Sequence, residues 1–133
     1  LEFLGYDNDD SINVDVQDLG ELRIDIIKMR EVFNNLITNS IKYNLSDSKE
    51  VKIWREGNLI YLEDNGIGID ESQKDKVFAF FRRLHAKEEF GGGTGAGMAI
   101  VKSVLDRHNV TIDFTSELGQ GTKFVMDFNA CVF

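Results

Sequence analysis

The residues best suited to do chemistry fall in two glycine clusters about thirty positions apart. The first reads Asp-Asn-Gly-Ile-Gly and contains Asp64, Gly66 and Gly68. The second, residues 93–97, reads Gly-Thr-Gly-Ala-Gly and precedes an amphipathic stretch. Glycine lets a backbone approach a ligand closely, so backbone N–H groups in these segments could form a site for a small polyanion.

Each cluster also has a plainer interpretation. Asp-Asn-Gly is a common turn sequence, so residues 64–68 form either a turn or a ligand loop. An EF-hand is excluded, because acidic residues are missing at the required alternate positions. Residues 93–97 form either a glycine-rich linker or a lid that ends at a helix N-terminus, where free N–H groups attract phosphate. They match neither a P-loop nor a dinucleotide fingerprint, because no Lys-Ser/Thr pair follows and no strand directly precedes.

A third polar set lies on a helix that helical spacing predicts over about residues 27–43. The predicted core stripe consists of Met29, Val32, Phe33, Leu36, Ile37 and Ser40. Asn35, Asn39 and Lys42 fall at i, i+4 and i+7, so they share one face beside that stripe. Asparagine is a mediocre helix former. These side chains are therefore either solvent-exposed or placed at the rim of a groove.

The remaining periodicity predicts the elements that position these residues. Alternation predicts strands over residues 11–16, 22–26, 51–54, 59–62, 110–115 and 122–128. The first two could pair as a hairpin after Gly20. The third and fourth are predicted to form a hairpin through Glu56-Gly57-Asn58, and the last two a hairpin through Gly119-Gln120-Gly121. The fourth runs directly into Asp64. Helices are predicted over residues 27–43 and 97–108, with a short one capped by Asp70 and reaching Val77. About six strands and three helices predict an α+β two-layer sandwich.

Composition limits the function classes. The 133 residues fit one domain, and the net charge of −8 argues against a broad surface for nucleic acid or an anionic membrane. No apolar run approaches the roughly 20 residues that span a bilayer, no signal peptide is expected, and the missing initial Met suggests a piece of a longer protein. The single cysteine, Cys131, indicates a reducing compartment and a buried thiol. His85 and His108 are too far apart in sequence to suggest a metal pair, and His108 is expected to be structural.

The combination of motifs is more specific than any one of them. Five segments occur in order: Asn35-Leu36-x-x-Asn39-Ser40-x-Lys42-Tyr43, Asp64-x-Gly66-x-Gly68, Val77-Phe78-x-x-Phe81, Gly93-Thr94-Gly95-x-Gly97-x-Ala99-Ile100-Val101-Lys102 and Gly119-x-Gly121-Thr122-x-Phe124. This order resembles the catalytic ATP-binding domain of sensor histidine kinases, in the GHKL ATPase superfamily, over about residues 28–128. The segment from Arg83 to Phe90 is most similar to phytochrome-type kinases.

The resemblance implies a fold and a reaction. The fold would be a Bergerat-type sandwich, with a mixed, mostly antiparallel sheet of five to six strands packed on three helices. Residues 1–133 would form one catalytic and ATP-binding domain, with an irregular lead-in over residues 1–10 and an ATP lid over about residues 82–97. The domain would bind Mg-ATP and transfer the γ-phosphoryl group to a histidine. Neither His85 nor His108 stands in the family's acceptor motif, so that histidine is expected in a separate dimerising domain.

The resemblance also implies roles for base and metal recognition. Asp64 would accept a hydrogen bond from the adenine amine, and a carboxylate, being acceptor-only, opposes guanine O6. Asp64 is expected in a loop outside the core. Gly66 and Gly68 would let the backbone approach the base, and Thr122 would contact it through water. Asn39 would be the Mg²⁺ ligand, with the other ligands coming from phosphate and water.

The same resemblance assigns phosphate binding to residues of the helix predicted over about residues 27–43 and to residues of the lid. Asn35, Lys42 and Tyr43 would line the Asn39 face, and Asn35, Asn39 and Lys42 form the expected catalytic set. The other expected nucleotide contacts are Ile69, Phe81, Arg82, Arg83, Thr94, Gly95, Ala96, Gly97 and Met98. The arginines would approach the phosphates from the start of the lid. Ala96 and Met98 replace larger aliphatic residues without an expected loss of binding.

The expected partners follow from this assignment. They are ATP and ADP, the histidine-bearing dimerisation domain of the same kinase and a downstream response regulator. The domain is expected to be cytoplasmic and monomeric when isolated, with no nucleic-acid or membrane contact. The alternatives are a non-catalytic GHKL module, an anti-sigma-type kinase that phosphorylates serine on a partner, and a metabolite-binding α+β domain with accidental glycines. The run from Phe78 to Phe81 favours the histidine-kinase branch.

Overall fold

The computed structural model describes residues 11–70, 72 and 96–132. In chain order the elements of this part are β1 (Ile12–Val16), α1 (Ile26–Lys42), β2 (Lys49–Glu56), β3 (Leu59–Asp64), α3 (Ala96–Arg107), β4 (Thr111–Glu117), β5 (Gly121–Asp127) and a short 3-10 helix, η2 (Asn129–Cys131). In the described part no helix is long and apolar enough to cross a membrane.

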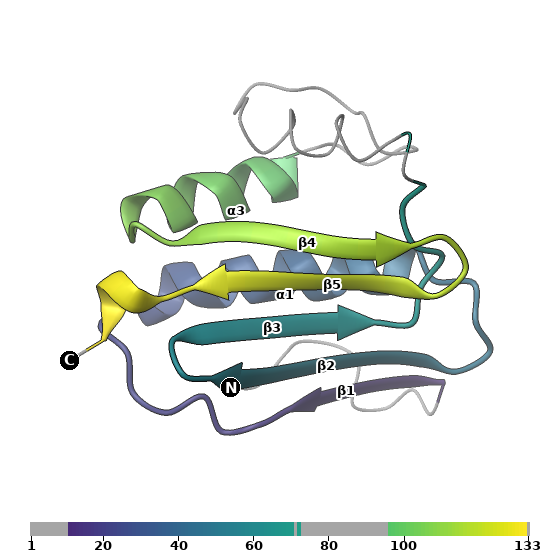
Figure 1. Ribbon diagram of the computed structural model, residues 1–133, viewed down its shortest axis with the longest axis horizontal. Helices are drawn as coiled ribbons and strands as arrows, with labels where there is room; N and C mark the ends of the chain where they lie inside the picture. Colours follow the sequence, from purple (N-terminus) through teal and green to yellow (C-terminus); the bar gives the residue numbers. More distant parts are fainter. Residues whose placement is uncertain (1–10, 71, 73–95, 133) are drawn as a thin grey trace.

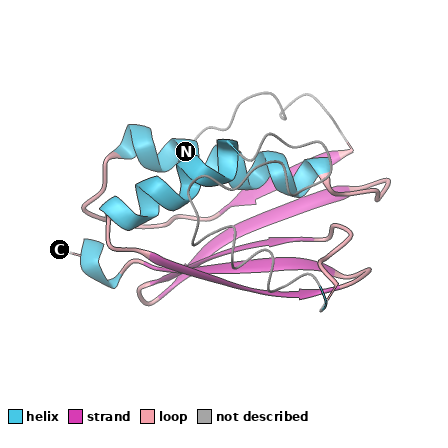
Figure 2. Cartoon of the chain, turned by 90° about the horizontal axis from the view of Figure 1, so that it is seen from above, coloured by secondary structure: helices cyan, strands magenta, loops and turns pink. Residues whose placement is uncertain are grey.

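The strands form one five-stranded sheet in the order β1-β2-β3-β5-β4. The β1 strand runs parallel to β2, and the other neighbouring pairs are antiparallel. The helices α1 and α3 both lie on one side of this sheet (Figure 1, Figure 2). The predicted α+β two-layer sandwich with a mixed, mostly antiparallel sheet is therefore confirmed.

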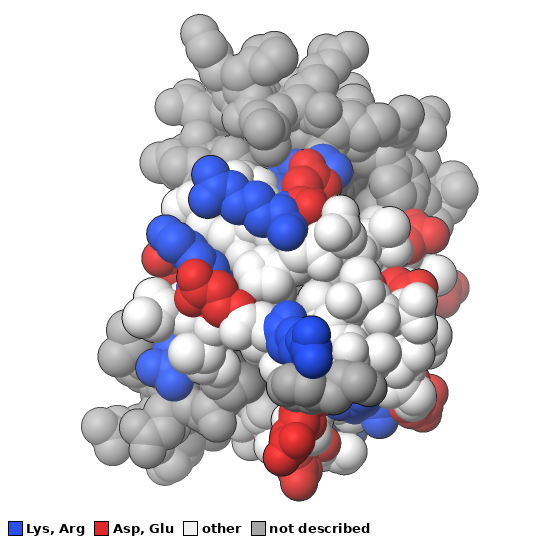
Figure 3. Space-filling model, turned by 90° about the vertical axis from the view of Figure 1, so that its left-hand side faces the viewer, with Lys and Arg blue, Asp and Glu red and all other residues white. Residues whose placement is uncertain are grey.

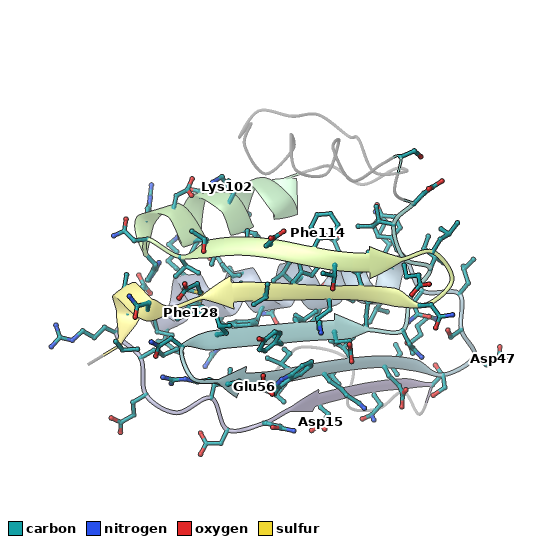
Figure 4. The ribbon with its side chains drawn as sticks, in the orientation of Figure 1. Asp15, Asp47, Glu56, Lys102, Phe114 and Phe128 are labelled. Carbon is teal, nitrogen blue, oxygen red and sulfur yellow. The ribbon has the colours of Figure 1, made fainter. Side chains whose placement is uncertain are left out.

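The core lies between the helices and the inward side of the sheet. Every residue of the stripe predicted on α1, from Met29 to Ser40, is buried. On β3, Ile60 and Leu62 alternate with exposed or half-buried neighbours and face the same layer. Phe114 on β4 and Phe128 just after β5, both labelled in Figure 4, are also buried. Burying such side chains contributes about 1.5–3 kcal/mol each.

The hairpin predicted over residues 11–26 is wrong. Residues 17–25 lie in no strand, and the β1 strand pairs with β2 instead, so the strand predicted over residues 22–26 is missing and the sheet of the described part has five of the five to six strands expected. The segment still buries Leu22 and Ile24 partly against the core. Its apolar alternation therefore comes from packing of a loop and not from a strand ladder. Its backbone bond from Arg23 N–H to the carbonyl of Cys131, at 2.6 Å, attaches it to η2.

One other boundary differs from expectation, and one agrees with it. Asp64 is the last residue of β3, paired with Thr122 of β5, and does not lie in a loop. The Asp70 carboxylate accepts from the N–H of Ser72 at 3.3 Å, as at a helix start. The rest of the short helix predicted there lies outside the described residues.

His108 and Cys131 have the structural roles expected of them. The Nε2 atom of His108 accepts from the N–H of Asp25 at 3.0 Å, and its Nδ1 lies 2.8 Å from the Val104 carbonyl. Since a carbonyl only accepts, the ring carries its proton on Nδ1. The Cys131 thiol is buried and contacts the His108 carbonyl oxygen at 3.4 Å. The end of α3 is thus joined to the start of α1.

Replacing Asp25 with alanine is expected to lower the free energy of unfolding by about 1 kcal/mol. Asp25 is the N-cap of α1, and its carboxylate accepts from the N–H groups of Ile27 and Lys28 at 3.1 and 3.2 Å. Urea unfolding of the purified chain measures the loss. Asp25→Asn keeps an accepting oxygen and should cost much less, so an equal loss in both variants would contradict the capping role.

Candidate functional site

Three polar residues form a row across the sheet on the side that faces the helices. Asp64 of β3 pairs with Thr122 of β5, and Thr122 pairs with Ser116 of β4. The residues beside them in sequence, such as Glu63 and Lys123, point to the opposite side of the sheet, because side chains alternate along a strand. In Figure 1 this end lies on the right, the end where Figure 4 labels Asp47. We call these three residues the polar row.

The carboxylate of Asp64 is held by several donors. Its Oδ1 accepts from the N–H groups of Gly66 at 2.9 Å and of Thr122 at 3.2 Å. The hydroxyl of Ser40, a buried residue of α1, also hydrogen-bonds to this side chain. A carboxylate fixed in this way is an acceptor that is pre-positioned for a donor group of a ligand.

Burial dominates the electrostatics of Asp64. It raises the pKa of this carboxyl above the ordinary value of 3.8, against the hydrogen bonds from Gly66, Ser40 and Thr122, which lower it. The neighbouring charge of Glu63 raises the pKa further. A perturbed carboxyl of this kind marks a candidate functional site.

The raised pKa predicts a pH dependence of stability. The folded state binds the Asp64 proton more tightly than the unfolded state, so the stabilisation from protonation is complete below 3.8 and is lost as pH rises through the folded pKa. Relative to Asp64→Asn, which does not titrate there, the wild-type chain should lose stability between acid and neutral pH. Urea unfolding of both proteins across this range measures the difference. If the difference in free energy of unfolding between the two proteins were the same at every pH, the prediction would be contradicted.

The turn after β3 is tied to two other elements. The N–H of Ile67 donates to the carbonyl of Tyr43 at the end of α1 (3.1 Å), and the Ile67 carbonyl accepts from the N–H of Gly119 (2.7 Å). The Asn65 side chain bonds to Asn44, Ser48 and Glu50. The turn is therefore fixed between the end of α1 and the β4–β5 hairpin before any ligand binds.

Contacts within the protein already require glycine at both positions of this turn, whether or not a ligand binds there. A Cβ on Gly66 would lie 2.9 Å from the Asp64 carboxylate and 3.0 Å from the Tyr43 carbonyl. Gly68 has φ +76°, and a Cβ there would collide with the carbonyl of Glu117. Only glycine satisfies both the backbone angle and the close approach. Their approach to a base stays a prediction.

The polar face predicted on α1 lies next to this site. Ser40, which contacts Asp64, follows Asn39 directly, and Lys42 and Tyr43 end the helix. The Nζ atom of Lys42 lies 5.4 Å from the centre of the Tyr43 ring. Asn35 is partly buried, and its Nδ2 donates to the Glu31 carbonyl at 2.8 Å. Ser40 thus links α1 to Asp64, while the roles of Asn35, Asn39 and Lys42 stay predictions.

Other predicted site residues are placed only in part. The N–H of Ile69 donates to the Ser116 hydroxyl at 2.7 Å, which connects the turn to the polar row. Ala96, Gly97 and Met98 are the first residues of α3, so a helix does begin at the second glycine cluster. Phe81, Arg82, Arg83, Thr94 and Gly95 lie outside the described residues.

Sequence reasoning missed Ser116 and the role of Ser40. Ser40 was assigned to the core stripe, and it is buried, but its hydroxyl serves Asp64. Ser116 carries no motif. The Gly-Gln-Gly turn at residues 119–121 was the available signal, because a hairpin through it could have placed Ser116 opposite Thr122.

A groove of about 490 Å³ lies at this end of the sheet. Its walls include Lys52, Glu63, Lys123 and Thr115, whose side chains point away from the helices. The three residues of the polar row also line it, so the groove extends around the end of the sheet where the row lies. Among residues 11–70, 72 and 96–132, no three His, Cys, Asp or Glu side chains gather as metal ligands.

The opposite end of the molecule shows how charge is distributed away from this site. In Figure 3 the described Lys and Arg side chains are separated by acidic and uncharged ones. They form no continuous basic surface on that face, as a strand of nucleic acid would require.

Comparison with known proteins decides the family. Residues 24–130 match the model of the histidine kinase-, DNA gyrase B- and HSP90-like ATPases. The chain belongs to this ATPase family. Together with the sensor kinases and solved histidine kinase domains that it resembles, this match makes it a histidine kinase-type ATPase domain, and the resemblance inferred from its motifs is confirmed.

Two curated relatives are a phytochrome and a sensor protein kinase. Cyanobacterial phytochrome B of Nostoc sp. (strain PCC 7120) is 44% identical over 105 residues, which cover 75% of this chain and 14% of that protein. Sensor protein kinase WalK of Staphylococcus saprophyticus is 42% identical over 106 residues, covering 74% and 17%. The chain thus spans less than a fifth of either relative.

Solved structures show the same fold. The mycobacterial sensor histidine kinase MprB superposes with a TM-score of 0.67 at 19% identity, covering 87% of this chain and 82% of that one. Full-length ShkA in complex with AMPPNP superposes with a TM-score of 0.62 at 20% identity, covering 86% and 25%. The architecture is therefore that of histidine kinase catalytic domains.

Proposed function

We propose that this domain binds Mg-ATP and donates the γ-phosphoryl group to a histidine in a separate domain of the same sensor protein. The observation that carries the proposal is the partly buried Asp64 carboxylate, held as an acceptor by Gly66, Thr122 and Ser40. Adenine offers an exocyclic amine as a donor, where guanine offers the acceptor O6. Family membership and the AMPPNP named with full-length ShkA support the choice of nucleotide.

The polar face of α1 suits the phosphates and the metal. Magnesium prefers oxygen ligands, and the neutral amide oxygen of Asn39 would be the ligand that the protein contributes. Its remaining ligands would be phosphate oxygens and water. Asn35 and Lys42 would hold the phosphates from the same face, with Lys42 as a point charge. When bound, Mg²⁺ neutralises charge on the transferred group, and the protein contributes mainly positioning.

The partners follow from the same proposal. The acceptor histidine, the dimer contacts and the signal input belong to other parts of the full-length sensor, and a response regulator receives the phosphoryl group next. The relatives that are named sensor kinase and phytochrome support this arrangement. A cytoplasmic location and a monomeric isolated domain are part of the proposal, and a lid over about residues 82–97 would close over the phosphates.

The decisive experiment supplies the missing substrate. The chain is mixed with Mg-ATP and a separately purified histidine-bearing hairpin domain of the same sensor, and the phosphorylated products are tested with acid. Acid-labile phosphate on the hairpin domain is the expected result. Acid-stable phosphate on a partner serine would favour the anti-sigma-type alternative. Nucleotide binding with no transfer to any partner would favour a non-catalytic module.

Asn39→Ala is expected to weaken ATP binding by about tenfold in the presence of Mg²⁺ and much less in its absence. The substitution removes a neutral oxygen ligand but leaves the base site around Asp64 intact. Calorimetric titrations with ATP, with and without Mg²⁺, measure the two affinities. Asn34→Ala, on the same helix but off the Asn39 face, is the matched control. An unchanged Mg²⁺ dependence in Asn39→Ala would contradict the metal assignment.

A further inference from the structure

Ser116 of the polar row has three hydrogen-bond partners among the residues that the structure describes. Its Oγ lies 2.7 Å from the Ile69 nitrogen, 2.9 Å from the Gly121 carbonyl oxygen and 2.9 Å from Thr122 Oγ1. A serine hydroxyl has one proton and two lone pairs. These three contacts therefore use its whole capacity.

The direction of each bond follows by elimination. The carbonyl of Gly121 can only accept, so it takes the single Ser116 proton. The N–H of Ile69 can only donate, so it occupies one Ser116 lone pair. The Thr122 hydroxyl must then donate its own proton to the remaining lone pair of Ser116.

This arrangement changes what Thr122 can offer to a ligand. A threonine hydroxyl normally rotates and can either donate or accept. Here its only proton points at Ser116, so its free lone pairs make it an acceptor. Its backbone N–H is used as well, since it donates to Asp64 at 3.2 Å. Asp64 and Thr122 thus stand side by side on β3 and β5, and both side chains accept hydrogen bonds.

We propose that Ser116 is a positioning residue for nucleotide selectivity, because it orients the Thr122 hydroxyl so that the base site accepts a 6-amino purine and disfavours a 6-oxo purine. The inference rests on the proposed ATP binding and deepens it. The inference requires Thr122 to meet the purine directly, in place of the water-mediated contact that the resemblance implies, and a freely rotating Thr122 hydroxyl could then donate to a purine O6. With Ser116 present, that donation requires breaking an existing, partly buried hydrogen bond. The negative charge of Asp64 repels a purine O6. Ser116 disfavours O6 because it holds the Thr122 proton that could otherwise be donated to it.

The test compares ATP with inosine triphosphate, which differs in carrying O6 in place of the 6-amine. In Ser116→Ala the Thr122 proton has no partner and is free to meet O6. The ratio of ATP to inosine triphosphate affinity should fall about fivefold to tenfold, mostly through tighter binding of inosine triphosphate. ATP affinity itself should change by less than about threefold, because a rotating hydroxyl can still accept. Ser116→Thr keeps the hydroxyl and should restore the wild-type ratio.

A double-mutant cycle separates this role from general loss of structure. Thr122→Val removes the hydroxyl that Ser116 orients. In that background Ser116→Ala should leave the ratio unchanged, whereas damage to the fold would alter it as before. An unchanged ratio in the single Ser116→Ala variant, or the same fall in both backgrounds, would overturn the inference while ATP binding itself stands. A wild-type chain that binds no ATP would overturn the proposed function and this inference together.

A second measurement needs no variant. In the ligand-free wild-type protein, NMR should find the Thr122 hydroxyl proton slowed in exchange and close in space to Ser116. A Thr122 proton that exchanges freely would also overturn the inference.

Discussion

Asp64→Asn is expected to lower the affinity for ATP by at least about 100-fold, the largest effect on binding of any single substitution in the described site. The amide oxygen of asparagine would take the N–H groups of Gly66 and Thr122, which now bond to Oδ1. Its NH₂ group would then replace the second carboxylate oxygen. A donor would face the adenine amine, and the negative charge would be lost. Calorimetry or displacement of a fluorescent nucleotide measures the loss.

The fold should survive this change. Tolerance of the Asp64→Asn substitution does not come from a loop position, because Asp64 is the last residue of a strand and is partly buried. It is expected because asparagine still accepts the two backbone bonds and removes a charge that is costly to bury. GTP should lose less affinity than ATP, since an amide NH₂ can donate to O6.

The matched control is Glu63→Gln, which removes the same charge one residue away. Glu63 points to the outward side of the sheet and is exposed. Its substitution should change ATP affinity by less than about threefold. Binding by Asp64→Asn within threefold of wild type, or equal losses in both variants, would show that the carboxylate does not recognise the base.

Gly121→Ala is expected to cost about 3 kcal/mol or more of folding free energy, the largest effect on stability expected from adding one methyl group. Gly121 starts β5 with φ +124°, and a Cβ there would run into the carbonyl oxygen of Asp64. The clash can be relieved only by separating β5 from β3 where the polar row lies. Nucleotide binding should therefore fall together with the unfolding midpoint in urea.

Gly119→Ala provides the comparison within the same turn. Gly119 also has a positive φ, +84°, but a Cβ there would meet nothing within 4 Å. Gly119→Ala should therefore lose only about 1 kcal/mol of folding free energy, from backbone strain. If the two variants lost equal stability, the close approach of Gly121 to Asp64 would not be the reason for this glycine.

The features that the sequence alone determined are those encoded within one segment. The α1 helix, its buried stripe and the adjoining Asn35, Asn39 and Lys42 face follow from a spacing of 3.6 residues, which the chain carries locally. The β2–β3 and β4–β5 hairpins follow in the same way from alternation interrupted by Gly57 and by residues 119–121. Ordered motifs around these elements were sufficient to indicate the ATPase family.

Tertiary structure decided what depends on which segments become neighbours. The alternation at residues 22–26 reads equally well as a strand, and only its position against the core shows that it is a loop. The polar row exists because β5 lies between β3 and β4 in a register that aligns Asp64, Thr122 and Ser116. Cross-strand register sets which hydroxyl meets which, and no local spacing encodes it. The sequence therefore indicated the acceptor at Asp64, while the folded sheet decided which way the proton of Thr122 points.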